Sequence, residues 1–441
     1  MFSNLFNFDI LAKILTALIL FIAIVVGLYS KTYLRGDKKR NIFLVLIFLI
    51  SISLIITFSS DNIFLFIISW MISNLLLVLI MIHKASWKQA KESGLLALKN
   101  FIIGFISLTI ALAILCSQAK SYKISEIILS ENINNSALII SCFFIVITAF
   151  SQSAIFPFQS WLISSLNSPT PASALMHAGL VNGGGVILTR FSPLLFKSPE
   201  LMNLIFLFGI FTALIAMIWK LMQSNVKAML ACSTISQMGF MISQCGLGLF
   251  AIAIAHLLWH GLFKSYLFLS SPSVWQEKRL EIKYPPSLIT FVMSLICGVL
   301  GALIFIKVNE ISFDQLQTIL VLVLICFISA TQMALTIINK FSFTKFSIAI
   351  FITTLLSTTY SFGIVFVENL MPKQFYNPQP LNLFHVITMF IIFSIWMIRI
   401  FWNKEKNANN KLILKLYVKL LNSSQPSFKT ITNNRNQYNF K

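Results

Sequence analysis

The chain has 441 residues, of which 57% are hydrophobic and only 10% are charged. Ordinary soluble domains carry about 25% charged residues, so this composition excludes a water-soluble enzyme. Apolar runs recur along almost the whole sequence, and each is long enough, as a helix, to cross a hydrocarbon layer about 30 Å thick. We therefore predict an all-α polytopic membrane protein. In such a protein the net charge of +20 reflects Lys and Arg in loops, and no nucleic-acid partner is expected.

The apolar windows predict about thirteen transmembrane helices, which form a membrane domain over residues 1–402. In chain order they cover Leu11–Tyr29, Ile42–Phe58, Ile63–Ile82, Phe101–Ser117, Ala137–Phe156, Ala172–Leu188, Leu201–Trp219, Ala228–Gly246, Phe250–Leu269, Leu288–Ile306, Leu316–Ile338, Phe346–Val367 and Leu383–Trp402. A basic loop follows the first window and no small-residue cleavage site is present, so we expect that window to stay as a membrane anchor.

The distribution of basic residues predicts the orientation in the membrane. Short cytoplasmic loops retain Lys and Arg. With the N-terminus outside and the C-terminus inside, 24 basic residues lie on the cytoplasmic side and six on the outer side. Residues 403–441 then form a basic cytoplasmic tail, in which Lys411, Lys415 and Lys419 recur every four residues among apolar side chains. This pattern is typical of an interfacial amphipathic helix on an anionic lipid surface; the alternative is a solvated tail.

Ionisable residues inside the spans are candidates for function, because a charge within a bilayer costs at least about 2.5 kcal/mol. His256, His260 and Lys264 are spaced by four residues in AHLLWHGLFKSYLFL. Each such step turns a helix by about 40° and rises about 6 Å. The three side chains therefore share one helix face, where imidazoles and a buried amine can pass protons through intervening waters. The alternative is a packing face whose histidines bond to backbone, with Lys264 reaching the membrane surface.

A second candidate region is SPTPASALMHAGLVNGGGVILTR, which contains His177 and Asn182. Thr170 is expected to cap its helix with Pro171 in the first turn, and three consecutive glycines after Asn182 weaken the helix near mid-membrane. A weakened helix beside His177 and Asn182 predicts a polar cavity, to which Gln152 of the preceding span also contributes. Gln152 can relay hydrogen bonds but cannot hold a proton at neutral pH. Alternatively, the glycines only permit tight packing and His177 is a satisfied core residue.

The residue types that are absent from the spans limit which kinds of ion, metal or cofactor site the chain can form. All thirteen carboxylates lie at or outside the span ends, so a cation site built on buried carboxylates is not expected. The six cysteines are at least 13 positions apart, and we interpret them as small apolar fillers. No phosphate-binding glycine motif occurs. We therefore expect no metal or cofactor on this chain, and an interior proton path that depends on His, Lys and neutral polar groups.

A family resemblance rests mainly on three stretches: SQSAIFPFQSWLISSLNSPTPASALMHAGLVNGGGVILTR, SNVKAMLACSTISQMGFM and HLLWHGLFKSYLFLSS. Two earlier stretches, YSKTYLRGDKKR and SDNIFLFIISW, share it. They are similar to the antiporter-like, proton-translocating subunits of respiratory complex I (NuoL-like) and of the Mrp antiporters, and the resemblance covers about residues 9–275. It implies the antiporter-like fold. Within the family, HAGLVNGGG followed by FLSS most resembles the DabB-type subunits of inorganic-carbon transporters. That resemblance implies a bacterial plasma membrane and a DabA-like zinc-binding partner subunit, with the zinc on the partner.

The resemblance also implies which residues carry protons. Five positions match basic residues of the family: His177, His256, His260, Lys264 and Lys227. Two charged residues of NuoL-like subunits are absent, because Met71 stands in place of a channel glutamate and Gln152 in place of a lysine. Asn225 replaces the aspartate of the turn before Lys227, and Lys307 is a weak candidate for a later lysine.

These observations lead to one main hypothesis and three alternatives. The main hypothesis is a non-enzymatic membrane subunit of an energy-coupled inorganic-carbon transporter, which conducts protons to drive accumulation of bicarbonate or carbon dioxide with a DabA-like partner. The alternatives are a proton-pumping subunit of NADH:quinone oxidoreductase or a membrane hydrogenase, an Mrp-type cation/proton antiporter subunit, and a scaffold that anchors its partner.

Overall fold

The computed structural model describes residues 5–272, 285–311, 317–339, 342–401 and 411–431. Within these ranges twelve helical segments are long and apolar enough to cross a membrane. The prediction of an all-α polytopic membrane protein is therefore confirmed. The remaining predicted span, Ala228–Gly246, also forms a helix, α12 (Val226–Gly246), but its Ser, Thr and Gln side chains make it less apolar than the other twelve.

The described residues form two compact units. The first contains those up to Gly246, those from His256 to 272, and those from Lys419 onward. The second contains Leu247–Ala255 and those from 285 to Val418. The candidate site residues fall in the first unit, apart from Lys307.

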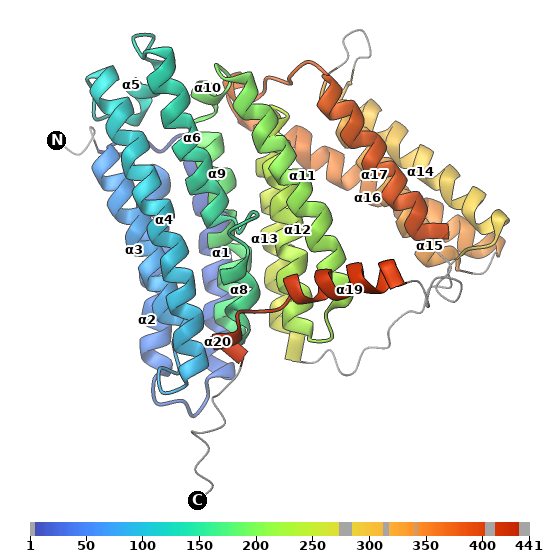
Figure 1. Cartoon of the computed structure of the whole chain (residues 1–441), viewed down its shortest axis with the longest axis horizontal. Helices are drawn as coiled ribbons and strands as arrows, with labels where there is room; N and C mark the ends of the chain where they lie inside the picture. The colour runs from blue at the N-terminus through green and yellow to red at the C-terminus, as the bar shows by residue number, and fades with distance from the viewer. Residues whose placement is uncertain (1–4, 273–284, 312–316, 340–341, 402–410, 432–441) are drawn as a thin grey trace, which may run out of the picture. The chain divides into compact units, whose positions relative to one another are not determined.

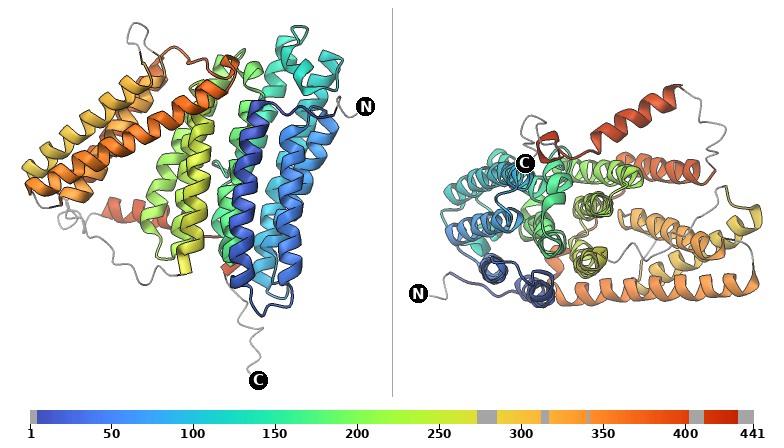
Figure 2. Two further views of the ribbon diagram at one scale, coloured as in Figure 1. Left: turned by 180° about the vertical axis from the view of Figure 1, so that it is seen from behind. Right: turned by 90° about the horizontal axis from the view of Figure 1, so that it is seen from below.

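Six helices begin the first unit (Figure 1). They are α1 (Ile10–Tyr33), α2 (Arg40–Ser59), α3 (Ile63–Met81), α4 (Lys88–Ala119), the short α5 (Ile124–Leu129) and α6 (Asn135–Gln152). Three of them start at a capping side chain, namely Asp9, Asn62 and Asn134. Such residues are favoured because their oxygen atoms accept from N–H groups that the first turn leaves unpaired. Helix α1 packs against α2, and α2 against α3 (Figure 2).

The middle of the first unit is irregular. In chain order it contains α7 (Ser160–Ile163), the 3-10 turn η2 (Ser164–Asn167), α8 (Thr170–Ala178), the 3-10 turn η3 (Leu180–Asn182), α9 (Gly183–Arg190) and α10 (Ser192–Leu195). Long helices resume with α11 (Pro199–Met222), α12 (Val226–Gly246) and α13 (Phe250–Ser270), which belongs to the first unit from His256 onward. Helices α8 and α9 together make one broken membrane-spanning segment, Thr170–Arg190.

The second unit is a smaller helical bundle. It contains α14 (Leu288–Val308), α15 (Ile319–Ile338), α16 (Phe343–Leu370), the 3-10 turn η5 (Lys373–Phe375) and α17 (Leu383–Phe401). One core cluster joins Phe291, Leu335, Trp396 and Ile400. Two short helices follow in the tail, α19 (Lys411–Ser423) and α20 (Phe428–Ile431).

The predicted spans agree with the observed helices to within three residues except at three ends, the first of which is the end of α1, at Tyr33 instead of Tyr29. Helix α4 starts at Lys88 instead of Phe101, because a helix can continue beyond the apolar window that predicts it. Helix α6 ends at Gln152 instead of Phe156; the following Pro157 lacks an N–H group and disfavours a helical residue before it. Two predicted span ends, Leu316 and Trp402, lie outside the described residues.

The cap predicted at Thr170 is wrong. Pro169 precedes the first helical residue of α8, and Thr170 is already within the helix. Pro171 lies in the first turn, as predicted, where its missing N–H costs nothing. The helix therefore starts one residue earlier than a Thr170 cap requires.

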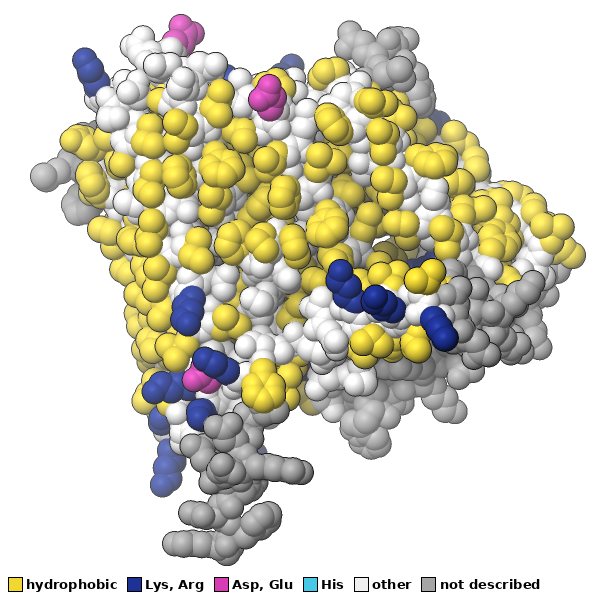
Figure 3. Space-filling view, viewed as in Figure 1, with side chains coloured by type: hydrophobic (Ala, Val, Ile, Leu, Met, Phe, Trp, Pro, Cys, Tyr) yellow, Lys and Arg dark blue, Asp and Glu magenta, His cyan; other side chains and the backbone are white. Residues whose placement is uncertain are grey.

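Apolar side chains cover much of the surface of the first unit. Examples are Ile106 of α4, Phe143 of α6 and Phe211 of α11, all exposed. Hydrophobic side chains dominate the face drawn in Figure 3. In a water-soluble protein such a face would be unfavourable. It is the surface expected of helices in contact with lipid chains.

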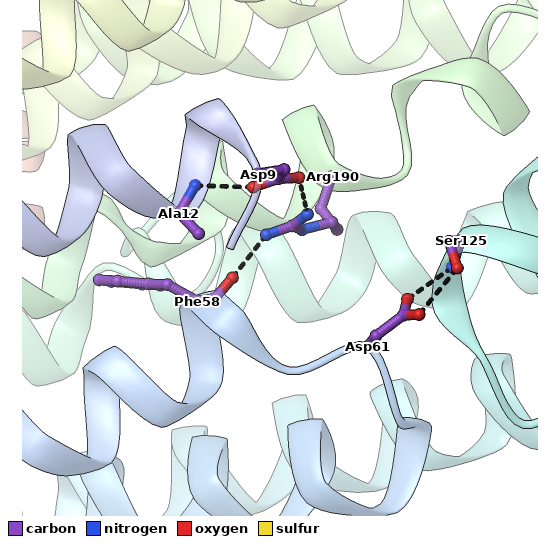
Figure 4. Close-up of polar contacts among 6 residues, drawn as sticks. All are labelled: Asp9, Ala12, Phe58, Asp61, Ser125 and Arg190. Carbon is purple, nitrogen blue, oxygen red and sulfur yellow. Dashed lines mark hydrogen bonds and ion pairs between the residues drawn. The ribbon is translucent and has the colours of Figure 1, made fainter. Parts of the chain in front are cut away.

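A polar cluster joins the ends of three helices in the first unit (Figure 4). Arg190, at the C-terminal end of α9, forms an ion pair with Asp9, which caps α1. The same guanidinium donates to the backbone oxygen of Phe58 in α2 at 2.6 Å. Nearby, Asp61 accepts from both the backbone N–H and the hydroxyl of Ser125 at 2.8 Å. These contacts fix the start of α1 against the end of the broken segment.

Candidate functional site

The centre of the first unit is the break between α8 and α9. Helix α8 ends at Ala178, a single 3-10 turn spans Leu180–Asn182, and α9 starts at Gly183. The break therefore precedes the three glycines, whereas the sequence suggested that the glycines themselves would weaken the helix. A break of this kind frees backbone carbonyl groups, and such groups are costly in the membrane interior unless they find donors.

Three side chains supply donors to the freed carbonyls. Asn182 Nδ2 donates to Ala178 O at 2.7 Å. From α6, Gln152 Nε2 donates to Leu180 O at 3.1 Å. The next residue, Ser153, donates through Oγ to the oxygen of Val181 at 2.7 Å. The break is thus a stable part of the fold, held open by polar residues from two segments.

The glycines of α9 allow neighbouring helices to approach closely. A Cβ atom on Gly183 would lie 2.8 Å from the ring of Trp70 in α3. On Gly184 it would collide with the backbone of Ala149 in α6, and on Gly185 it would lie 2.6 Å from Met241 in α12. The triplet therefore packs α9 among three other helices, as the packing interpretation of the glycines expects.

Helix α13 presents its basic residues to the protein interior. His256, His260 and Lys264 are 6%, 5% and 1% exposed, while Phe263 and Tyr266 of the same helix are well exposed. The His256 and His260 rings lie with centroids 6.2 Å apart. The interpretation in which Lys264 reaches the membrane surface is therefore wrong, because this side chain is buried.

The neighbours of these basic residues are mostly apolar or backbone groups. Lys264 Nζ donates to Leu230 O of α12 at 3.3 Å, and the ring of Phe240 meets His256 edge-on at 5.2 Å. Within the described residues neither ring nitrogen of His260 has a hydrogen-bond partner. A buried polar group without a partner is costly. His260 is therefore suited to bind water or a passing proton, and it does not make the backbone bonds that the packing alternative requires.

His177 of α8 contacts the same face of α13. Its ring stacks on Phe268 with centroids 4.2 Å apart and an interplanar angle of 14°. A Cβ atom on Gly261 of α13 would lie 2.8 Å from Ala178 O, so the two helices approach closely at this level. The four basic residues predicted from the sequence thus belong to one region of the first unit.

Lys227 lies at the start of α12, and its side chain contacts the lead-in to α8. Its Nζ donates to Ser168 O at 2.9 Å. Asn225 Oδ1 accepts from the backbone N–H of Lys227 at 2.8 Å, so it fills the capping role that an aspartate would have. By contrast, Lys307 lies in the second unit, exposed in the last turn of α14.

A neutral amide pair lies where the resemblance implies charged groups. Gln152 Nε2 donates to Asn74 Oδ1 of α3 at 3.0 Å, and both residues are buried. Asn74 follows Met71 by three positions, about one helical turn. In this chain a hydrogen-bonded pair of amides therefore links α3 to α6, and neither amide carries charge.

A small cavity adjoins this pair and the break. Gln152, Asn182 and Ser73 line it together with apolar residues of α1 such as Ile19. The volume open to water centres is about 20 Å³, and one water needs about 10–15 Å³ on this measure. Asn182 Oδ1 is buried and has no partner within the described residues. The cavity can therefore accommodate a water that bonds to amide groups, while the four basic side chains do not line it.

Several contributors to the site were missed by the sequence reasoning. Phe268 continues the spacing of four from Lys264, so extending that pattern by one step would have found it. Ser153 directly follows Gln152, so its hydroxyl could have been added as a further donor of that segment. Asn74 and Phe240 carry no sequence signal, because their roles depend on contacts with other helices.

The described carboxylates avoid the interior of the spans, as predicted. Asp9 precedes α1, Glu200 lies in the first turn of α11 and Glu368 in the last turn of α16. Glu277, Glu281, Asp314 and Glu405 lie outside the described residues. Among described residues no group of three His, Cys, Asp or Glu side chains is arranged to hold a metal ion.

The fold and this region define a multi-pass helical membrane protein with a broken segment and a buried basic face. The chain belongs to the NADH:quinone oxidoreductase/Mrp antiporter transmembrane family, whose model matches residues 60–284. Over 96% of its length the chain also superposes on a chain of the Mrp complex from Dietzia sp., with a TM-score of 0.58 and 20% sequence identity, and covers 45% of that chain. This likeness confirms the antiporter-like fold.

Two relatives illustrate the range of similar proteins. The probable inorganic carbon transporter subunit DabB1 of Halothiobacillus neapolitanus is 33% identical over 279 residues, which are 62% of this chain and 50% of the relative. NADH-ubiquinone oxidoreductase chain 5 of Schizophyllum commune is 32% identical over 258 residues, 58% of this chain and 38% of the relative. The resemblance to DabB-type and NuoL-like subunits is therefore confirmed. The chain spans about half the length of the first three DabB relatives.

Proposed function

We propose that this chain is a proton-conducting membrane subunit of an energy-coupled inorganic-carbon transporter. The observation that carries the proposal is the buried basic face of α13 beside the broken segment, with His260 unpartnered at both ring nitrogens among the described residues. Similarity to DabB subunits supports inorganic carbon as the cargo. The proposed partner is a DabA-like subunit that holds zinc, and the proposed location is the bacterial plasma membrane with the N-terminus outside.

The chemistry of the proposed path follows from the residue types. An imidazole accepts a proton on one ring nitrogen and releases one from the other. Successive basic residues on α13 are separated by a rise of about 6 Å, so protons pass between them through intervening water. Lys264, held by Leu230 O, continues the same face. In this proposal His177 lies beside the path on α8, and Lys227 lies at one end of α12.

The energy available is sufficient for carbon accumulation. A membrane potential of 100 mV supplies about 2.3 kcal/mol per elementary charge, which corresponds to roughly a fifty-fold concentration ratio per proton. Coupling requires two conformations whose populations the proton shifts. In the proposed complex the partner captures carbon dioxide or bicarbonate, and this chain supplies the ion flux.

The proposal can be tested by growth at ambient carbon dioxide. The chain and its genomic neighbour are expressed in a bacterium that lacks carbonic anhydrase. Wild type is compared with His260→Ala and with His385→Ala, a matched control because His385 is a buried histidine of α17 in the second unit. We expect wild type and His385→Ala to rescue growth, and His260→Ala or an added protonophore to abolish rescue. Rescue that survives His260→Ala in an assembled complex would contradict proton conduction and favour a scaffold.

A second measurement separates the remaining alternatives. The complex is purified and its co-purifying subunits are identified. A zinc-containing partner is expected, whereas iron–sulfur subunits would support the respiratory alternative. If an assembled complex never rescues growth, the carbon-transport proposal is wrong. Sodium flux in proteoliposomes would instead indicate a cation/proton antiporter.

A further inference from the structure

The tail contains a helix with two contrasting faces. In α19 (Lys411–Ser423) no residue is buried. Successive helical residues are rotated by about 100°, so Lys411, Lys415 and Lys419 fall within an arc of about 80°. Basic side chains lie in a row along this helix (Figure 3). The sequence left open whether this segment is an interfacial helix or a solvated tail.

The rest of the α19 circumference is largely apolar. Its apolar residues occupy an arc of about 240°, which is most of the circumference that the lysines leave free. Leu414 and Leu416 are both 58% exposed and Tyr417 is 46% exposed. Leaving so many large apolar groups in water is unfavourable, at about 25 cal/mol per Å² of apolar surface. A wide apolar arc flanked by lysines is the pattern of a helix that lies in a membrane interface.

The C-terminal end of α19 is fixed at the end of a membrane-spanning helix. Trp219 Nε1 donates to Ser423 Oγ at 2.9 Å, and Gln223 Nε2 donates to Ser424 Oγ at 2.9 Å. Trp219 lies in the last turn of α11, and Gln223 directly follows it. The same turn carries the exposed Lys220, and lysines near the ends of membrane-spanning helices are typical of the membrane–water boundary. These bonds therefore place the end of α19 at the depth of the lipid headgroups.

The residues after α19 are held by further hydrogen bonds. The backbone N–H of Ser427 donates to Ser164 Oγ at 2.9 Å, and Asn167 Nδ2 donates to Thr430 O at 2.8 Å. Ser424 is fully buried and Thr430 is 4% exposed. The segment after α19 thus packs into the first unit, and its hydrogen bonds keep the C-terminal end of α19 near the membrane interface.

We propose that α19 is a binding site for anionic phospholipid. Lys411, Lys415 and Lys419 bind headgroup phosphates, while Leu414, Leu416 and Tyr417 insert among the upper parts of the acyl chains. The lysines favour a lipid surface over a protein groove as the partner of α19. An apolar protein groove would need only the leucines, whereas a row of lysines beside the leucines is complementary to a negatively charged bilayer. This proposal is independent of the proposed transport function.

The test uses the full chain in nanodiscs and measures the depth of α19. A spin label is attached to Leu416→Cys after the six native cysteines are replaced by alanine. Its contact with oxygen, which dissolves in lipid, is compared with its contact with a water-soluble nickel chelate. One set of nanodiscs contains only phosphatidylcholine, and the other contains phosphatidylcholine and phosphatidylglycerol. The variant Lys411→Gln/Lys415→Gln/Lys419→Gln is compared with a matched control, Lys31→Gln/Lys38→Gln/Lys39→Gln, which removes three other exposed lysines.

With phosphatidylglycerol we expect the label to be accessible to oxygen and shielded from nickel. Each lysine near an anionic surface contributes about a fivefold preference, so the triple α19 variant should weaken lipid association by roughly a hundredfold and return the label to water. The matched control should retain wild-type depth. Equal nickel access in both lipids would overturn the proposal. So would an oxygen-accessible label that ignores phosphatidylglycerol and the lysines, or a label shielded from both reagents, which would indicate a protein partner.

Discussion

The sharpest structural prediction concerns Gln152, which supports the break between α8 and α9. Gln152→Leu keeps a side chain of similar size but removes two donated bonds, to Asn74 Oδ1 at 3.0 Å and to Leu180 O at 3.1 Å. Both acceptors then lie in the interior without this donor. Hydrogen bonds inside membrane proteins contribute about 0.6 kcal/mol on average and about 1.7 kcal/mol at most. The loss is therefore about 1.2 to 3.4 kcal/mol for the two bonds.

The effect is best measured locally, because a chain with two compact units need not unfold in one step. Hydrogen exchange of the peptide covering residues 178–186 reports opening of the break itself. Since 1.36 kcal/mol corresponds to a factor of ten, exchange in Gln152→Leu should be faster by about eightfold to three-hundredfold. Peptides from α14 and α15 in the second unit serve as the internal control and should exchange at the wild-type rate.

A double-mutant cycle isolates the pair. Asn74→Leu removes one of the two bonds, so its exchange should increase less than that of Gln152→Leu. The combined variant should show a coupling free energy of about 0.6 to 1.7 kcal/mol. If Gln152→Leu exchanges no faster than Asn74→Leu, or the coupling is zero, then Gln152 does not hold Leu180 O and the account of the break is wrong.

Two further predictions concern packing and a loop. Gly184→Ala should destabilise the protein by about 1 to 3 kcal/mol, because its Cβ would meet the backbone of Ala149. Gly27→Ala should be neutral or stabilising, because no atom lies within 4 Å of the added Cβ. Thermal denaturation in detergent compares the two variants, and equal midpoints would refute the packing argument. The pKa of Asp37 lies below its usual range because the Lys39 backbone N–H and the His83 side chain donate to its carboxylate. This stabilisation is present above the unfolded-state pKa and is lost as the pH falls through the lower folded-state pKa. His83→Ala should therefore raise the Asp37 pKa, as measured by carboxyl-carbon NMR titration; an unchanged midpoint would show that His83 contributes nothing.

The spans were predictable because each depends on a local property, the length of an apolar run. The sequence placed the ends of the span Leu11–Tyr29 within four positions of α1. It placed the end of the span Ile63–Ile82 within one position of the end of α3. Ends were less predictable where the helix continues into polar sequence, as at Lys88 in α4. The length of an apolar run reflects the thickness of the membrane, and a helix can extend beyond that thickness.

The basic row of the candidate site was predictable because its residues share one helix. His256, His260 and Lys264 follow from the helical period, and the structure places all three on one buried face. The position of the break was not predictable, because it depends on donors from α6 that meet Leu180 and Val181 only in the folded chain. Whether these residues carry protons stays a prediction.

The ion pair between Asp9 and Arg190 has a consequence for the order of assembly. The two residues are 181 positions apart, and a ribosome adds about 5 to 20 residues per second. About 10 to 40 s therefore pass between the synthesis of Asp9 and the arrival of its partner. During that interval α1 is in the membrane with its capping carboxylate still lacking the guanidinium. Helix α1 thus reaches its final contacts only after α9 has been synthesised.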